Sequence, residues 1–322
     1  MDEWIRRWTD AMRGRRYAEA YAIGDAVMAM RDPATRDDPA LPYHRRWLWD
    51  GRPLDGADVL VRCRQGLGDT IQFARFLSLL VRRAARVTVE ASARLHPLLE
   101  PLVGHERLIA FDPARPTPWH GIDVEIMELG HALRAGPGDV PPPYLTARPA
   151  PLPRGTIGLC PAAGDWDASR NLPAGLLAPL CAARPCLSLL PGASALPVVN
   201  PDGCPFDLAA TASLVAGCAL VVTVDTMVAH LAGALGVPTW LMLKYEPDWR
   251  WSATARDSDW YPSVRLYHQP APGDWPAVAA AIVRDLKEQA DEPCPDALGP
   301  RVLGRADRQN HHPGDQARAP AA

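Results

Sequence analysis

A carboxylate, a hydroxyl and an imidazole follow one apolar run of this sequence at helical spacing. The run Leu220–Val224 is continuous and largely β-branched, as a parallel strand buried on both faces requires. Asp225 then stands where a helix N-cap belongs, followed by Thr226 and, one turn later, by His230. Helical side chains lean toward the N-terminus, so His230 leans back toward the unpaired amides there. The pattern predicts an anion site at the carboxyl edge of a parallel sheet, with an ordinary helix cap as the alternative for Asp225.

The helix that begins there is predicted to turn its polar side away from the core. Its apolar residues recur at the spacing of one helix face and are Val228, Leu231, Ala232 and Leu235. Thr226, His230 and Gly233 fall on the opposite side of the helix. We therefore expect these three residues on a face that is free for a ligand.

A second strand-to-helix junction carries glycines and another carboxylate. Residues 58–63 predict a first strand, which is followed by the turn RQGLGD. Gly66 and Gly68 permit a tight turn with its backbone close to a ligand. The third glycine of the dinucleotide fingerprint is replaced by Ile71, so a nicotinamide dehydrogenase is disfavoured. What remains is Asp69 at the mouth of the first strand, with a helix cap as the alternative.

These two segments resemble the family 9 glycosyltransferases, the heptosyltransferase type. VDTMVAHLAGALG is similar to the signature of that family's C-terminal domain, and QGLGDTIQFARFL is similar to its N-terminal Gly-Asp motif. The resemblance implies that Asp69 is the catalytic base. It also implies that Asp225, Thr226 and His230 border the pyrophosphate and the sugar of a nucleotide sugar.

The resemblance covers residues 47 to 286 and includes the late segments 247–251 (PDWRW) and 259–269 (DWYPSVRLYHQ). These two segments look like the form of the fold that is fused to tetratricopeptide repeats. The chain departs from the family after the first strand of the second domain, where members carry a longer polar loop with a basic residue for the phosphates. Here that loop is AAGDWDASRNLP, and we assign the phosphate role to its cation, Arg170. An ordinary surface arginine is the alternative.

Four segments follow from the alternation of apolar runs and turn residues. Residues 1–50 form a helical segment and linker, spaced like one tetratricopeptide unit or like an ordinary helical hairpin. Residues 51–150 and 151–290 each alternate strands with helices, which predicts two doubly wound, Rossmann-like α/β domains. The resemblance arranges them as a GT-B fold, with the acceptor side in the first domain and a cleft between the two. Residues 291–322 read as a disordered tail.

Composition narrows the classes of function. The 322 residues are 48% hydrophobic, which suffices for two buried cores, and a formal net charge of -3 offers no electrostatic case for nucleic acids. No apolar run is long enough to span a membrane, and the start MDEWIRRWTD lacks a signal core, so we expect a cytoplasmic chain with peripheral membrane contact left open. The Asp-x-Asp pairs at 165–167 and 257–259 occur about as often as chance predicts, and His311 and His312 are adjacent tail residues. We therefore expect no metal site.

The resulting hypothesis is a metal-independent, inverting glycosyltransferase without a cofactor. It would move a sugar from a nucleotide diphosphate sugar to a hydroxyl acceptor on a lipid-linked glycan or a protein, and the resemblance favours ADP-heptose and lipopolysaccharide or glycan biosynthesis. Asp69 would take the proton of the acceptor. The departing diphosphate would be held by the amides at Thr226 and Met227, the Thr226 hydroxyl and Arg170. The alternatives are a non-catalytic nucleotide-sugar-binding or scaffold module and, third, an isomerase of nucleotide sugars.

Overall fold

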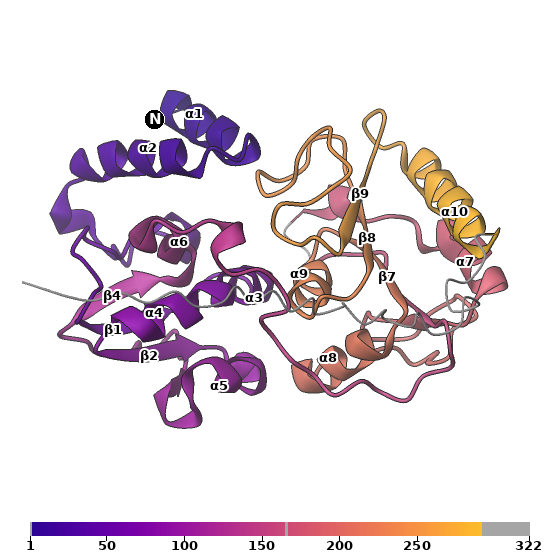
Figure 1. Ribbon diagram of the computed structural model, residues 1–322, viewed down its shortest axis with the longest axis horizontal. Helices are drawn as coiled ribbons and strands as arrows, with labels where there is room; N and C mark the ends of the chain where they lie inside the picture. The colour runs from indigo at the N-terminus through magenta and orange to yellow at the C-terminus, as the bar shows by residue number, and fades with distance from the viewer. Residues whose placement is uncertain (1, 165–166, 292–322) are drawn as a thin grey trace, which may run out of the picture.

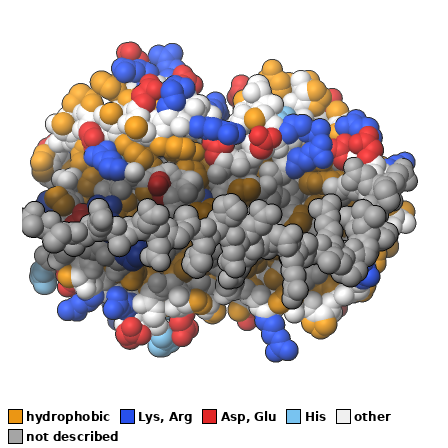
Figure 2. All heavy atoms as spheres, in the orientation of Figure 1, with side chains coloured by type: hydrophobic (Ala, Val, Ile, Leu, Met, Phe, Trp, Pro, Cys, Tyr) orange, Lys and Arg blue, Asp and Glu red, His pale blue; other side chains and the backbone are white. Residues whose placement is uncertain are grey.

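A computed structural model describes residues 2–164 and 167–291 as two α/β halves preceded by a helical hairpin (Figure 1). The predicted tail lies outside the described residues from position 292 onward, as do Asp165 and Trp166 of the first Asp-x-Asp pair. Among the described helices, none has the length and apolar character needed to cross a membrane. On the face drawn in Figure 2, basic and acidic side chains are interspersed over both halves, in keeping with the small net charge.

The N-terminal hairpin contacts both halves. It consists of α1 (Asp2–Arg13) and α2 (Tyr17–Ala29). Tyr21 Oη donates to the carbonyl oxygen of Ala135 in the first half (2.6 Å), and Arg13 Nη2 donates to that of Pro247 in the second (2.7 Å). One pair of helices is too small to fold alone, and it packs here on the remainder of the chain, as expected. Its relation to a tetratricopeptide unit stays a prediction.

The first half is a parallel sheet of four strands in the order β3-β2-β1-β4. The strands are β1 (Asp58–Arg62), β2 (Arg86–Ala91), β3 (Leu108–Ala110) and β4 (Ile122–Glu125). The helices are α3 (Leu67–Phe73), α4 (Leu77–Arg83), α5 (His96–Val103) and α6 (Leu129–Leu133). Val59, Val61 and Val89 point to one face of the sheet, where they share a core with apolar residues of these four helices.

The opposite face of this sheet differs from the predicted doubly wound pattern. It carries a buried ion network, in which Arg62 lies 3.0 Å from both Glu90 and Asp123. Arg36 of the linker reaches Asp123 (2.7 Å), and the backbone of the loop 111–121 donates to Glu90 (2.7 Å). This loop joins β3 to β4 and contains three prolines, which disfavour a crossover helix there. Linker and loop thus contact the face where a helix layer was expected.

The second half is doubly wound around a parallel sheet in the order β6-β5-β7-β8-β9. Its strands are β5 (Ile157–Cys160), β6 (Cys186–Ser188), β7 (Leu220–Val224), β8 (Thr239–Leu243) and β9 (Val264–His268). Two helices, α7 (Ala178–Ala183) and α10 (Trp275–Asp291), pack in the core of one face, and α8 (Leu208–Gly217) and α9 (Met227–Ala234) pack on the other. The buried run of β7 is central in the sheet, as its continuous apolar sequence predicts.

The two halves share one hydrophobic core. Buried residues of α3, α4 and α5 belong to the same cluster as those of α8 and α9. Figure 1 shows α3 beside α9 and α5 near α8 at the junction, and both pairs are in contact. The helix layer of the first half is therefore covered by the inner helix layer of the second.

Candidate functional site

The two strand-to-helix junctions singled out in the sequence meet at Gly68. The first turn of α3 packs on the first turn of α9 so closely that a Cβ atom on Gly68 would lie 3.0 Å from His230 Cδ2 and 3.3 Å from Met227 Cα. Neither Gly66 nor Gly68 has a positive φ. The glycine at position 68 is thus explained by the close approach of the two helices, and not by a tight turn.

Asp69 serves as a helix cap and as one member of an ion pair. Its Oδ2 accepts from the Gly66 amide (3.1 Å), while its Oδ1 pairs with Arg250 Nη2 of the second half. Arg250 also donates to Gln72 Oε1 (2.7 Å) and to Asp248 Oδ1 (2.8 Å). The Asp69 side chain is 27% exposed, so a ligand can reach the carboxylate.

A pocket of about 180 Å³ opens beside this ion pair. It is lined by Asp167, Arg170, Asp225, Met242, Leu243, Lys244, Glu246, Pro247 and Asp248. Arg170 Nη1 donates to the Asp225 carbonyl oxygen (2.9 Å), and Lys244 Nζ donates to Asp167 Oδ2 (2.6 Å). Arg170 therefore lies at the mouth of β7, where its phosphate role stays a prediction, and Lys244 is a second cation there that was not predicted.

Asp225 is a desolvated carboxylate and not the helix cap. Burial raises the pKa of Asp225 to about 6, and the negative charge of Asp248 adds to the effect. The helix begins at Met227, so the N-cap residue is Thr226, whose side chain makes no capping hydrogen bond. The cap assignment of Asp225 is therefore wrong by one residue, and the Thr226 hydroxyl is available at the helix N-terminus.

His230 is enclosed, which contradicts the expectation of a free polar face. Its Nδ1 lies 3.0 Å from Tyr261 Oη, and its ring stacks on Trp251 with centroids 5.5 Å apart. Gly233, on the same face, lies against the Tyr261 ring. Burial lowers the pKa of His230 well below its ordinary value, and the positive charge of Arg250 adds to the effect, so the imidazole is neutral near pH 7. The segment after β8 folds over this side of the helix, which a local pattern does not reveal.

Arg75 is a fully buried guanidinium at the same junction. Its Nη2 donates to the Trp260 carbonyl oxygen (2.8 Å) and its Nη1 to that of Pro137 (3.3 Å). Its Cζ lies 4.8 Å and 5.1 Å from the ring centroids of Tyr144 and Tyr261. Carbonyl dipoles and aromatic faces stabilise this cation, and its positive field adds to those of the other arginines at the junction.

All the predicted site residues lie at this junction. They are Gly66, Gly68, Asp69, Arg170, Asp225, Thr226, Met227 and His230. Sequence reasoning missed Arg75, Lys244, Arg250 and Trp251. The segment PDWRW, which contains Arg250 and Trp251, is part of the resemblance. Its alternation of charged and aromatic residues is the signal from which these two residues could have been predicted.

Metal-ligating side chains are not clustered in the described part of the chain. No group of three or more His, Cys, Asp or Glu residues there could hold an ion. Asp259, of the Asp-x-Asp pair at 257–259, instead pairs with Arg15 (2.5 Å) and accepts from Tyr17 Oη (3.2 Å). It anchors the N-terminal hairpin.

Comparison with known proteins gives distant structural likenesses. No protein-family model matches the chain, and no curated protein matches it at a significant level. The family 9 glycosyl transferase from Veillonella parvula superposes with a TM-score of 0.45 at 13% identity, over 74% of this chain and 91% of that one. The iron-containing dodecameric glycosyltransferase TibC from enterotoxigenic E. coli gives 0.46 at 13% identity, over 74% and 78%. E. coli heptosyltransferase WaaC with ADP-2-deoxy-2-fluoro heptose gives 0.47 at 15% identity, over 72% and 99%.

Proposed function

We propose that this chain is a metal-independent, inverting glycosyltransferase that uses a nucleotide diphosphate sugar. The observation that supports it best is the meeting of two junctions, one with a reachable carboxylate, Asp69, and the other with cations and a helix N-terminus beside a pocket. Residues 51–150 would bind the acceptor and residues 151–290 the donor. The cytoplasmic location stays a prediction.

In this proposal the diphosphate binds where positive charge is concentrated. Arg170 and Lys244 line the pocket, and the Thr226 hydroxyl and Met227 amide lie at the start of α9. Such preorganised donors stabilise the charge that develops on the leaving diphosphate. The neutral His230 contributes a hydrogen bond and no charge. A volume of about 180 Å³ holds one sugar ring or a diphosphate.

Asp69 would act as the general base. It takes the proton of the acceptor hydroxyl as that oxygen forms a bond to the anomeric carbon and the bond from this carbon to the diphosphate oxygen breaks. Arg250 holds the carboxylate in place from the opposite half, and Gly66 holds its second oxygen. The sugar is thereby transferred with inversion in a single displacement.

The variant Asp69→Asn tests this role. Asn retains the size of the side chain and its capping ability but cannot accept the proton, so transfer should fall by about 10²–10⁴ while donor affinity is preserved. Sugar transfer to cell-extract acceptors and donor binding are measured with a panel of nucleotide diphosphate sugars, beginning with ADP-heptose. Asp58→Asn, at the other end of β1, is the matched control and should transfer at the wild-type rate. An active Asn variant would remove Asp69 from the mechanism.

A non-catalytic nucleotide-sugar-binding module is the second candidate. It is favoured by the engagement of Asp69 with Arg250, which leaves one carboxylate oxygen already bound to a cation. A wild-type chain that binds donor and transfers to no acceptor in the same experiment would establish this alternative.

Transfer should also survive metal chelation. The described residues offer cations and amides for the diphosphate, and these can replace a divalent ion. Activity is measured after EDTA treatment and again after addition of Mg²⁺ or Mn²⁺. A loss that either ion restores would contradict the metal-independent mechanism.

A further inference from the structure

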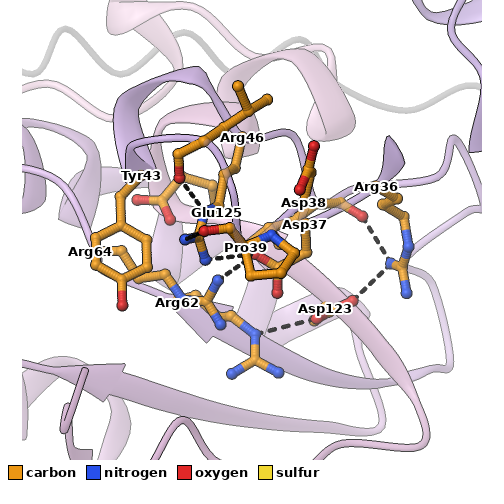
Figure 3. Close-up of polar contacts among 12 residues, drawn as sticks. Arg36, Asp37, Asp38, Pro39, Tyr43, Arg46, Arg62, Arg64, Asp123 and Glu125 are labelled. Atoms are coloured by element: carbon orange, nitrogen blue, oxygen red, sulfur yellow. Dashed lines mark hydrogen bonds and ion pairs between the residues drawn. The ribbon is translucent and has the colours of Figure 1, made fainter. Parts of the chain in front are cut away.

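A strap, residues 36–49, places one carboxylate between two arginines at the carboxyl end of β1 (Figure 3). Arg64 Nη1 donates to Asp37 Oδ1 at 2.5 Å, and Arg46 Nη1 lies 3.5 Å from the same oxygen. Both guanidinium groups lie over the ring of Tyr43, with their Cζ atoms 5.5 Å and 4.4 Å from its centroid. Two cations thus converge on a single carboxylate oxygen, and one aromatic ring contacts both of them.

Two buried polar atoms beside this cluster have no hydrogen-bond partner. They are Arg64 Nε, on a side chain that is 3% exposed, and Oε1 of Glu125. Glu125 ends β4, the strand that pairs with β1, so its side chain belongs to the same sheet edge as Arg64. Buried polar groups are nearly always paired in native proteins, and an unpaired donor at a strand end indicates a missing ligand.

Two guanidinium groups share one carboxylate in this cluster. Arg46 and Arg64 both pair with Asp37, while burial and the neighbouring Glu128 raise the pKa of Glu125 well above its ordinary value. The network on the adjoining face of the sheet is different, since Arg36 and Arg62 there face two acids. One guanidinium can bind an oxyanion through two nitrogens, whereas Asp37 engages a single nitrogen of Arg64.

We infer that Arg46 and Arg64 form a binding site for an oxyanion of the acceptor, a sugar carboxylate or a phosphate, and that Asp37 occupies this site until the ligand displaces it. Asp37 can leave because its side chain is 32% exposed and belongs to the strap, and not to the sheet. Arg64 precedes Asp69 by five residues in the same turn, so the anion would fix the acceptor beside the base. The assignment of the anion to the acceptor rests on the proposed function, whereas the anion site itself does not.

The affinity of the Asp37→Asn variant for small anions tests this site. Removing the charge of the internal carboxylate frees Nη1 of both arginines, while Arg46 keeps its bonds to the carbonyl oxygens of Leu41 and Pro39. Inorganic phosphate or D-glucuronate should therefore bind at least tenfold more tightly than to the wild type, and neutral D-glucose should not. Binding is measured by isothermal titration calorimetry at low ionic strength. The anion that gains more identifies the chemistry of the acceptor group.

Two further variants assign the gain to the arginines. Each of two substitutions, Arg64→Gln and Arg46→Gln, is added to Asp37→Asn, and each should abolish the gain in anion affinity. The Arg46 side chain is 15% exposed, and either double variant suffices if the other does not fold. Asp38→Asn is the matched control, because Asp38 binds the Ala40 amide of its own turn (2.8 Å) and should leave anion affinity unchanged.

The donor pocket must be separated from this site. With Arg170→Gln present throughout, the gain on Asp37→Asn should persist. Unchanged anion affinity in Asp37→Asn, or a gain that disappears with Arg170→Gln, would overturn the inference. Because no donor or transfer enters the measurement, a chain without transferase activity would still pass or fail this test.

Discussion

The junctions β1–α3 and β7–α9 each place a carboxylate near the first turn of the helix and give it opposite surroundings. Asp69 is more than a quarter exposed and faces the guanidinium of Arg250. Asp225 is desolvated and faces a second carboxylate, Asp248, so that its pKa rises to about 6. Partners contributed by distant segments therefore decide the electrostatic surroundings of these two groups, whereas the strand-to-helix turn decides only their position.

Removing the residue that connects the two junctions should have the largest effect. Arg250→Met leaves Asp69 and Asp248 without their partner in a largely buried place, and the free energy of unfolding should fall by about 3 kcal/mol. Urea unfolding measures it. Arg107→Met, at a surface pair with Glu106, is the control and should cost less than about 0.5 kcal/mol. Equal free energies of unfolding for the two variants would show that the ion pairs of Arg250 do not stabilise the fold.

Forcing the junctions apart should have the next largest effect. In Gly68→Ala the new methyl group meets the His230 ring and the backbone of Met227, so the helices must separate and stability should fall by about 2 kcal/mol. Donor affinity should fall with it. Gly175→Ala adds a methyl group in open space and is the control for thermal unfolding and donor titration. A variant at position 68 that behaves like the control would contradict the close packing.

The raised pKa of Asp225 gives an effect that depends on pH, and it allows the sharpest comparison. Because the folded-state pKa of Asp225 lies above its unfolded value of about 3.9, its contribution to stability is fully present below about pH 4 and is lost as the pH rises through 6. Asp225→Asn should therefore match the wild type near pH 4 and exceed it by up to about 3 kcal/mol at pH 7.5. Urea unfolding between these values checks it, and parallel curves would contradict the raised pKa.

The parts of the site that were predicted depend on local sequence. The strand Leu220–Val224, the turn with Gly68 and Asp69, and the helix after Thr226 are each encoded within about a dozen residues by apolar runs and turn residues. Their meeting across the junction followed from the resemblance and from the rule that ligand sites lie at the carboxyl edges of parallel strands.

The parts that were missed depend on contacts between distant segments. His230 has the spacing of a free helix face, and it is buried because Trp251 and Tyr261, in the segment after β8, fold over it. Arg75 lies among apolar helix residues. Nothing within its own helix shows that a carbonyl oxygen far along the chain accepts a hydrogen bond from its guanidinium group. The prolines of the loop 111–121, however, are visible in the sequence, and they disfavour a helix on the second face of the first sheet.

The bridging hairpin sets an order for assembly on the ribosome. Its helices are translated before both halves, yet the bond from Arg13 to Pro247 spans 234 positions and that from Tyr17 to Asp259 spans 242. At ordinary elongation rates the nascent hairpin waits on the order of tens of seconds for these partners. The apolar helices α3–α5 wait similarly for α8 and α9, and in that interval they are a surface that a chaperone would recognise. The contacts of the hairpin with the second half can thus form only late, and non-local contacts of this kind slow the final step of folding.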